Sequence, residues 1–293
     1  MPGPDFLGIG MPKAGTDWLY DQLDVHPQFW MPPLKELHFF DYVQPASLYE
    51  RGHSSHKVWK RLNNASERRE EFARRMQDTR GRTYSHRDDA FLDRVSALLC
   101  NGFSIEDYKT LFEVKEPLIS GDITPAYCTL DEKNIEYVAK NLAPNLKLVL
   151  LIRNPVERLW SQLCMQIRRR PECESMLENF DEFRAYVERP GVQARSYASL
   201  SFERWARTVP EQRIWAGLLD DLRDNATGFR ASVIRFLGAD PEAYQGDRPP
   251  GFNRKVEEKK FPISCEHRTY LREYFDDEIR RCAQLFGGHA NRW

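Results

Sequence analysis

The stretch of residues 6–20 constrains the fold more than any other part of the chain. A short apolar run, residues 6–9, has the length and character of a buried strand. It leads into a turn rich in glycine and proline, and an amphipathic stretch begins at Thr16 and ends near Pro27. In a strand–loop–helix unit, backbone N–H groups and the helix N-terminus converge on an anion. We therefore predict a phosphate-binding loop here.

Two side chains strengthen this prediction. Lys13 adds a positive charge beside the loop, and Thr16 adds a hydroxyl donor at the start of the helix. The pattern is similar to the nucleoside-triphosphate motif G-x-x-x-x-G-K-[ST] but differs in order, because the lysine precedes the Gly-Thr pair. The loop therefore predicts a bound phosphate without naming the nucleotide.

Composition argues against a nucleic-acid-binding protein and against a membrane-spanning one. The chain has 293 residues, with 43 basic against 44 acidic side chains, which gives no electrostatic reason to expect a nucleic-acid partner. Its longest apolar runs, residues 6–10 and 146–152, are far too short for a transmembrane segment, and no signal peptide is visible. Six cysteines without a C-x-x-C pair indicate reduced thiols, and the scattered histidines indicate no metal site. We expect a cytoplasmic enzyme.

Strands and helices alternate along the rest of the chain. Further strands are expected at residues 117–123, 146–152 and 213–219, each followed by a helical pattern. This alternation predicts an α/β fold with a central parallel sheet flanked by helices, a P-loop-like three-layer arrangement. Residues 43–115 lack a strong strand signal and read as a mainly helical lid inserted into a single domain, with an exposed loop at 78–89 and arginines on solvated faces. The last helix is expected over 264–286.

A second anion site is expected after the clearest strand. Arg153 follows residues 146–152 directly, Pro155 marks the start of a helix, and Ser161 lies about two turns into it. Carboxyl ends of parallel strands meet at one edge of the sheet, so Arg153 and Ser161 can reach one anion there, and Asp122 can face the same cleft. A kinase usually places a magnesium-binding aspartate at such a strand end, whereas an arginine suits direct phosphate binding without metal.

The candidate base lies in residues 29–41, FWMPPLKELHFFD. Paired prolines and two aromatic pairs predict a rigid, buried segment that holds Glu36 and His38 amid apolar surface. Burial raises the pKa of a carboxylate, which makes Glu36 a candidate general base. The residues alone favour a structural salt bridge of Glu36 with Lys35 or an arginine, and His38 is expected to be structural.

Several stretches, in this order, resemble the sulfotransferase family that uses 3′-phosphoadenosine 5′-phosphosulfate (PAPS). Residues 12–19 (PKAGTDWL) resemble its 5′-phosphosulfate loop, residues 151–161 (LIRNPVERLWS) its 3′-phosphate segment, and residues 236–238 and 286–293 its C-terminal half. Residues 35–41 (KELHFFD) and 124–127 (TPAY) are similar to heparan sulfate glucosaminyl sulfotransferases and their bacterial relatives. The chain departs from these patterns at two positions. Asp17 stands where many members of the family have Ser or Thr, and Ile123 stands where the heparan-type enzymes have a lysine.

This resemblance implies roles for residues already singled out. Lys13 would stabilise the leaving oxygen and Glu36 would deprotonate the acceptor; with the resemblance, the base is the favoured role of Glu36. The 5′-phosphate would be held by the loop, and the 3′-phosphate by the second anion site. The implied donor-binding residues are Lys13, Ala14, Gly15, Thr16, Asp17, Trp18, Arg153, Ser161, Tyr197, Arg254 and Lys259. The product would be adenosine 3′,5′-bisphosphate, with no metal required.

The acceptor is not encoded in any motif. A hydroxyl or amine of a small molecule, a lipid or a glycan is compatible with the sequence, as is a homo-oligomer. Two other functions stay open at this point: a magnesium-ATP-dependent P-loop kinase, and a non-catalytic nucleotide-binding module. Arg153 in place of a metal-binding aspartate argues against the kinase, and the combination of Lys13, Glu36, Arg153 and Ser161 argues against the non-catalytic module.

Overall fold

The computed structural model describes residues 3–41, 64–65, 67–80, 82–99, 104–244 and 261–293. The strands are β1 (Phe6–Gly10), β2 (Gly121–Ile123), β3 (Lys147–Ile152) and β4 (Ile214–Leu218). The helices are α1 (Thr16–Asp24), α3 (Arg69–Arg80), α4 (His86–Leu99), α5 (Ile105–Thr110), α6 (Glu132–Asn141), α7 (Pro155–Arg169), α8 (Phe180–Val187), α9 (Pro190–Gln193), α10 (Ala198–Ala206), α11 (Leu219–Asp224), α12 (Ala226–Leu237), α13 (Cys265–Tyr274) and α14 (Asp276–Phe286). Short 3₁₀ turns are η2 (Glu113–Lys115), η3 (Pro125–Thr129), η4 (Pro171–Leu177), η5 (Glu211–Arg213), η6 (Pro241–Ala243) and η8 (Gly288–Arg292).

The four strands form one parallel sheet in the order β2-β1-β3-β4. The chain moves from β1 in one direction to β2 and then back in the other direction to β3 and β4. Because crossovers between parallel strands are right-handed, α1 lies on one face of the sheet while α6 and α7 leave on the other. The helices that follow β1 and β3 therefore lie on opposite faces of the sheet. Open sheets bind ligands at such a point, outside the carboxyl ends of the strands.

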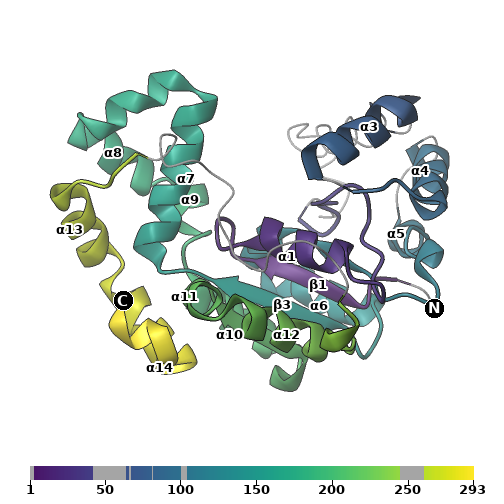
Figure 1. Ribbon diagram of the computed structural model, residues 1–293. Coiled ribbons are helices and arrows are strands. Elements are labelled where there is room, and N and C mark those ends of the chain that lie inside the picture. The colour runs from purple at the N-terminus through teal and green to yellow at the C-terminus, as the bar shows by residue number, and fades with distance from the viewer. Residues whose placement is uncertain (1–2, 42–63, 66, 81, 100–103, 245–260) are drawn as a thin grey trace.

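Side-chain contacts identify which helices share a face. On the α1 face, Arg230 of α12 donates to Gln22 of α1 at 3.1 Å. On the other face, Trp205 of α10 donates its indole N–H to the Tyr127 carbonyl of η3 at 3.3 Å. Figure 1 shows α1 and β1 at the centre, with α3, α4 and α5 grouped at one end and α7, α8 and α13 at the other. The α/β fold predicted from the sequence, with helices on a central parallel sheet, is confirmed.

Apolar strand residues bury the sheet on both faces. All residues of β1 are buried, and so are residues 148–152 of β3, as expected for strands covered on each side by helices. A second apolar cluster packs α7 against α8 and α13, around Leu163, Phe183 and Leu271. The sheet therefore holds the loop regions at its carboxyl edge on a rigid support.

The inserted region is helical where it is described, but one expectation for it is wrong. Residues 78–89 were expected to form an exposed loop, whereas α3 continues to Arg80 and α4 begins at His86. Arg82 between them is only 7% exposed, contrary to the expectation that the arginines of this region lie on solvated faces. Its guanidinium pairs with Asp24 at 2.7 Å and Asp88 at 2.5 Å. Two buried carboxylates fix this arginine inside the protein.

The insertion also shares the main core. Trp30 packs on Phe91 of α4, and Phe39 stacks on Tyr108 of α5 with ring centroids 4.5 Å apart. These helices therefore support residues 29–41, the segment of the candidate base. A closing motion over the site, which the term lid implies, stays a prediction. The last expected helix is in fact two, α13 and α14, because the chain bends at Phe275.

Candidate active site

The loop of residues 11–15 joins β1 to α1 at the edge between β1 and β3. Met11 donates its N–H to the Leu151 carbonyl at 2.5 Å, which fixes the loop to β3. Gly15 has φ 102°, in the left-handed region that favours glycine, and caps α1. The Leu19 N–H donates to the Gly15 carbonyl at 3.0 Å, so the N–H groups of residues 16–18 lie in the first turn of α1, at its N-terminus. They form a ready anion site at the positive end of the helix.

Lys13 and Arg153 lie together at this loop. The Arg153 guanidinium donates to the Lys13 carbonyl at 3.2 Å, and the Lys13 ammonium lies 3.7 Å from the Met165 sulfur of α7. The loop expected at the 5′-phosphate, which carries Lys13, is thus in contact with Arg153, which is expected at the 3′-phosphate. Ala14 is less available than the resemblance implies, because its N–H donates to the Met11 carbonyl at 3.1 Å.

Lys35 is a residue of the candidate site that the sequence did not single out. Its side chain is 7% exposed, and its ammonium lies 2.7 Å from Asp17, 3.1 Å from the Thr16 hydroxyl and 3.7 Å from the Glu36 carboxylate. The same lysine therefore contacts both the phosphate loop and the candidate base. Its position next to Glu36 in the sequence was the only available signal, and it pointed to a simple salt bridge.

Glu36 begins a chain of charged groups. Its carboxylate lies 3.5 Å from Nε2 of His38, and Nδ1 of His38 lies 2.7 Å from the Asp41 carboxylate. Burial lowers the pKa of His38, but hydrogen bonds with Asp41 and Glu36 outweigh that effect and raise the pKa to about 9. The imidazole is accordingly protonated at neutral pH, between two carboxylates.

The expectation that the pKa of Glu36 is raised is wrong. Burial does favour the neutral acid, but the hydrogen bond from His38 and the positive charge of Lys35 outweigh it, so the pKa lies below its ordinary value. The side chain is also 39% exposed rather than enclosed by apolar surface. Glu36 is therefore ionised at neutral pH and free to accept a proton.

Asp122 holds the segment that carries Glu36. It is 1% exposed and does not line a cleft; it receives hydrogen bonds from the hydroxyls of Tyr127 (2.6 Å), Thr124 (2.7 Å) and Tyr108 (3.0 Å). The Leu37 N–H also donates to it, at 3.4 Å. Burial raises the pKa of Asp122, and the hydroxyl donors oppose that rise. This buried carboxylate positions the backbone next to Glu36.

Glu157 and Ser161 lie four residues apart on one side of α7, and Arg153 precedes that helix, directly after β3. Arg153 donates from Nε and Nη2 to one oxygen of Glu157, at 3.3 and 3.1 Å. The same oxygen receives a hydrogen bond from Arg223 of α11 at 3.0 Å. The sequence predicted Arg153 and Ser161 but gave no sign of Arg223, since it lies 70 residues farther along the chain.

Four other predicted donor-binding residues lie apart from this group or outside the described ranges. Tyr197 is at the start of α10, where its ring contacts Phe275 at 5.9 Å in the second apolar cluster. Its role in donor binding stays a prediction. Arg254 and Lys259 lie outside the described residues. Trp18 is 3% exposed and packs on Phe229 of α12, with ring centroids 5.5 Å apart.

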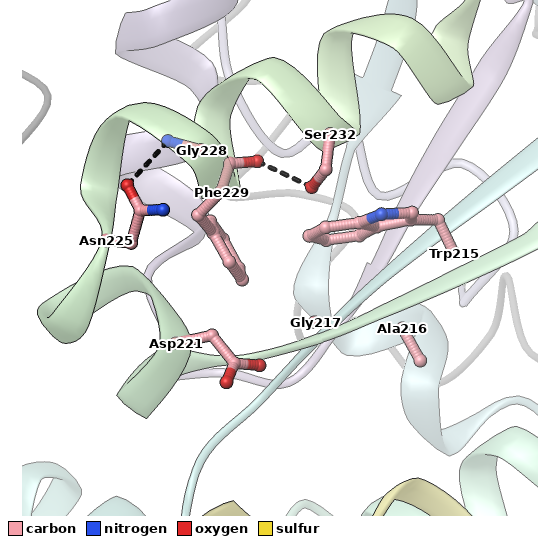
Figure 2. A pocket seen from close by; sticks show the side chains of 8 residues that line it. All are labelled: Trp215, Ala216, Gly217, Asp221, Asn225, Gly228, Phe229 and Ser232. Atoms are coloured by element: carbon pink, nitrogen blue, oxygen red, sulfur yellow. Dashed lines mark hydrogen bonds between the residues drawn. The ribbon is translucent and has the colours of Figure 1, made fainter. Parts of the chain in front are cut away.

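A pocket of about 310 Å³ lies at the free edge of the sheet, between β4, α11 and α12. Figure 2 shows the Trp215 and Phe229 rings and the Asp221 carboxylate around it. None of the predicted site residues lines this pocket, although Phe229 contacts Trp18 of the loop helix.

Two observations concern metals and membranes. Within the described ranges, no three His, Cys, Asp or Glu side chains gather in a way that could hold a metal ion. Across those same ranges, no helix has both the length and the apolar character needed to cross a bilayer.

A sequence profile described as the sulfotransferase family matches residues 4–243. The match covers the loop of residues 11–15, the Glu36 segment, Arg153 and the strands β1 to β4. The chain belongs to the sulfotransferase family. This membership implies a sulfuryl donor and an acceptor. No curated protein gave a significant sequence match.

Solved structures similar to this sulfotransferase carry the same fold. A sulfotransferase from Alicyclobacillus acidocaldarius superposes with a TM-score of 0.57 at 16% identity, covering 97% of this chain and 96% of that one. The sulfotransferase domain of the Synechococcus PCC 7002 olefin synthase gives 0.55 at 17% identity, with 94% and 95% coverage. The sulfotransferase domain from the curacin biosynthetic pathway gives 0.52 at 17% identity, with 97% and 98% coverage. At these identities the likeness is one of fold.

Proposed function

We propose that this sulfotransferase moves the sulfuryl group of PAPS to a hydroxyl or amine of its acceptor, with Glu36 as the base. The loop of residues 11–15 and the start of α1 would hold the 5′-phosphosulfate, and Arg153 and Ser161 the 3′-phosphate. Lys13 would neutralise the charge that develops on the departing 5′-phosphate. Positioning and electrostatic stabilisation would supply most of the rate enhancement.

The observation that carries this proposal is the position of Lys35. Its ammonium contacts Thr16 at 3.1 Å and Glu36 at 3.7 Å, so a carboxylate lies beside the phosphate loop. In an in-line transfer, the acceptor oxygen or nitrogen approaches the sulfur from the side opposite the leaving phosphate. Glu36 could take the acceptor proton from that direction, while Lys35 adds a second positive charge near the loop.

His38 and Asp41 would keep Glu36 ready as a proton acceptor. The protonated imidazole faces Glu36 at 3.5 Å and is itself oriented by Asp41 at 2.7 Å. An ionised carboxylate can take the proton of the attacking hydroxyl or amine while the new bond between that group and sulfur forms. The proton would then reside on Glu36 and pass to solvent when product leaves, which the 39% exposure of the side chain permits.

The branch of the family is part of the same proposal. Residues 35–41 and 124–127 resemble heparan sulfate glucosaminyl sulfotransferases and their bacterial relatives, and in this structure both segments meet at Asp122. A glycan, lipid or small molecule would each supply a hydroxyl or amine of the required kind. The absence of a lysine at Ile123 removes one cation that would favour a sulfated polysaccharide.

The test is Glu36→Gln, which keeps the shape of the side chain and removes its basicity. Turnover of PAPS should fall roughly 10²- to 10⁴-fold, as is typical for loss of a general base. Binding of adenosine 3′,5′-bisphosphate, measured by calorimetry, should stay within about twofold of wild type because Glu36 does not hold the donor. Normal turnover in this variant would remove Glu36 from the mechanism.

A further inference from the structure

The side chains around Glu157 form a small, charged arrangement that the proposed donor site does not explain. One carboxylate oxygen of Glu157 accepts three N–H groups: two from Arg153, at 3.3 and 3.1 Å, and one from Arg223, at 3.0 Å. These arginines come from the end of β3 and from α11. Two guanidinium groups thus converge on one point, which is the geometry that binds a phosphate oxygen.

This point lies where the proposed function needs an anion. Arg153 also donates to the Lys13 carbonyl, which places the cluster directly beside the phosphate loop. Ser161, the other residue expected at the 3′-phosphate, lies one turn beyond Glu157 on α7. A negative oxygen therefore already lies between Arg153 and Arg223, one helical turn before the serine.

The exposure of these side chains allows a phosphate to replace the Glu157 carboxylate. The Arg153 side chain is 17% exposed, whereas those of Glu157 and Arg223 are 37% and 42% exposed. Glu157 can therefore rotate toward water, and a phosphate can enter from the same side. Arg223 is kept in place by a second partner, since it donates to Asp220 at 3.0 Å. Asp220 in turn accepts the Trp293 indole N–H at 2.9 Å.

On the basis of the proposed function, we propose that Arg223 is a second guanidinium of the 3′-phosphate pocket and that Glu157 occupies its anion position until the phosphate displaces it. The exchange replaces one negative charge by the two of a phosphate monoester, so both arginines gain a stronger partner. Burial raises the pKa of Glu157, but Arg153 and Arg223 outweigh it and lower that pKa, so the carboxylate is charged when it competes. A salt bridge serving stability alone, at this exposure, would contribute little.

The test compares two nucleotides that differ only in the 3′-phosphate. Affinities for adenosine 3′,5′-bisphosphate and adenosine 5′-monophosphate are measured by calorimetry on wild type, Arg223→Met, Arg223→Lys and Glu157→Gln. Arg235→Met, an exposed arginine of α12, serves as the matched control. Arg223→Met should weaken bisphosphate binding roughly 10- to 100-fold, the range for a lost charge-assisted hydrogen bond, with the monophosphate affinity unchanged. Arg223→Lys should lose part of this preference, because a lysine lacks the planar fork.

Glu157→Gln should bind the bisphosphate about fivefold more tightly, because the competing charge is gone. An unchanged ratio of the two affinities in both Arg223 variants would overturn the role of Arg223. Weaker bisphosphate binding by Glu157→Gln would show that Glu157 supports the bound phosphate, and would overturn its displacement.

The outcome also separates this inference from the proposed function. If wild type prefers the bisphosphate and Arg153→Met loses that preference, the donor site stands even where Arg223 proves irrelevant. If wild type itself shows no preference for the bisphosphate, the proposed donor is wrong.

Discussion

Two neighbours set the protonation state of Glu36. His38 and Lys35 lie 3.5 and 3.7 Å from its carboxylate, and together they lower its pKa despite partial burial. A base with a low pKa is a weaker proton acceptor but is fully ionised at neutral pH. Catalysis by such a base depends on proton transfer late in the reaction, once the acceptor has become acidic through its new bond to sulfur.

His38 makes stability depend on pH in a defined direction. Its pKa rises from 6.5 to about 9 on folding, so the protonated ring stabilises the fold fully below pH 6.5, and this stabilisation is lost as pH rises through about 9. The shift corresponds to on the order of 3 kcal/mol. The free energy of unfolding of wild type should therefore fall by about that amount between these pH values, relative to His38→Gln.

Chemical denaturation across this pH range measures the effect. His86→Gln, a substitution of an exposed histidine on α4, is the control and should keep the wild-type pH profile. Parallel profiles for wild type and His38→Gln would contradict the charged chain from Glu36 to Asp41.

The segment of residues 35–41 keeps its shape through Asp122 of β2. Three hydroxyls and one backbone N–H donate to this buried carboxylate. The sequence predicts Asp122 at a strand end that faces the cleft, whereas it is the middle residue of β2 and is buried. Strand ends are easy to locate from apolar runs, whereas hydroxyl donors at residues 108, 124 and 127 meet only after the chain has folded.

Asp122→Asn tests this support. The asparagine has the same shape, but its amide N–H₂ faces hydroxyls that donated to the carboxylate, so at least one buried donor loses its acceptor. We expect a loss of about 2–4 kcal/mol in the free energy of unfolding, together with reduced turnover. Asp181→Asn, an exposed substitution on α8, should change stability by less than about 0.5 kcal/mol. Unchanged turnover in a destabilised Asp122→Asn protein would show that Asp122 supports the fold but not Glu36.

Much of the architecture was predictable because it depends on local patterns. The apolar runs of β1 and β3, the glycine-containing loop and Pro155 at the start of α7 each report their own structure. Long-range charge pairing was not predictable in the same way. Arg82 pairs with Asp24 and Arg223 with Glu157, partners far away along the chain, and nothing in the neighbouring sequence distinguishes these arginines from exposed basic residues.

Arg82 ties the inserted helices to the sheet domain. Its guanidinium bridges Asp24 of α1 and Asp88 of α4, whose side chains are 3% and 0% exposed. Arg82→Ala would leave two buried carboxylates without their cation, so we expect a loss of about 3–5 kcal/mol in the free energy of unfolding. Arg74→Ala, at an exposed position of α3, should stay within about 0.5 kcal/mol of wild type in the same denaturation experiment. Equal stability of the two variants would contradict this anchoring role.

The proposed function requires two anion sites at the point where the helices diverge, one at the loop of residues 11–15 and one at Arg153, with the Glu36 carboxylate beside the loop. A crystal structure with adenosine 3′,5′-bisphosphate examines this arrangement in one step. We predict the 5′-phosphate at the N–H groups of residues 16–18 and Lys13, and the 3′-phosphate at Arg153. A nucleotide whose phosphates lie elsewhere, for example in the pocket beside Trp215, would contradict the proposed donor site and the role of Glu36 with it.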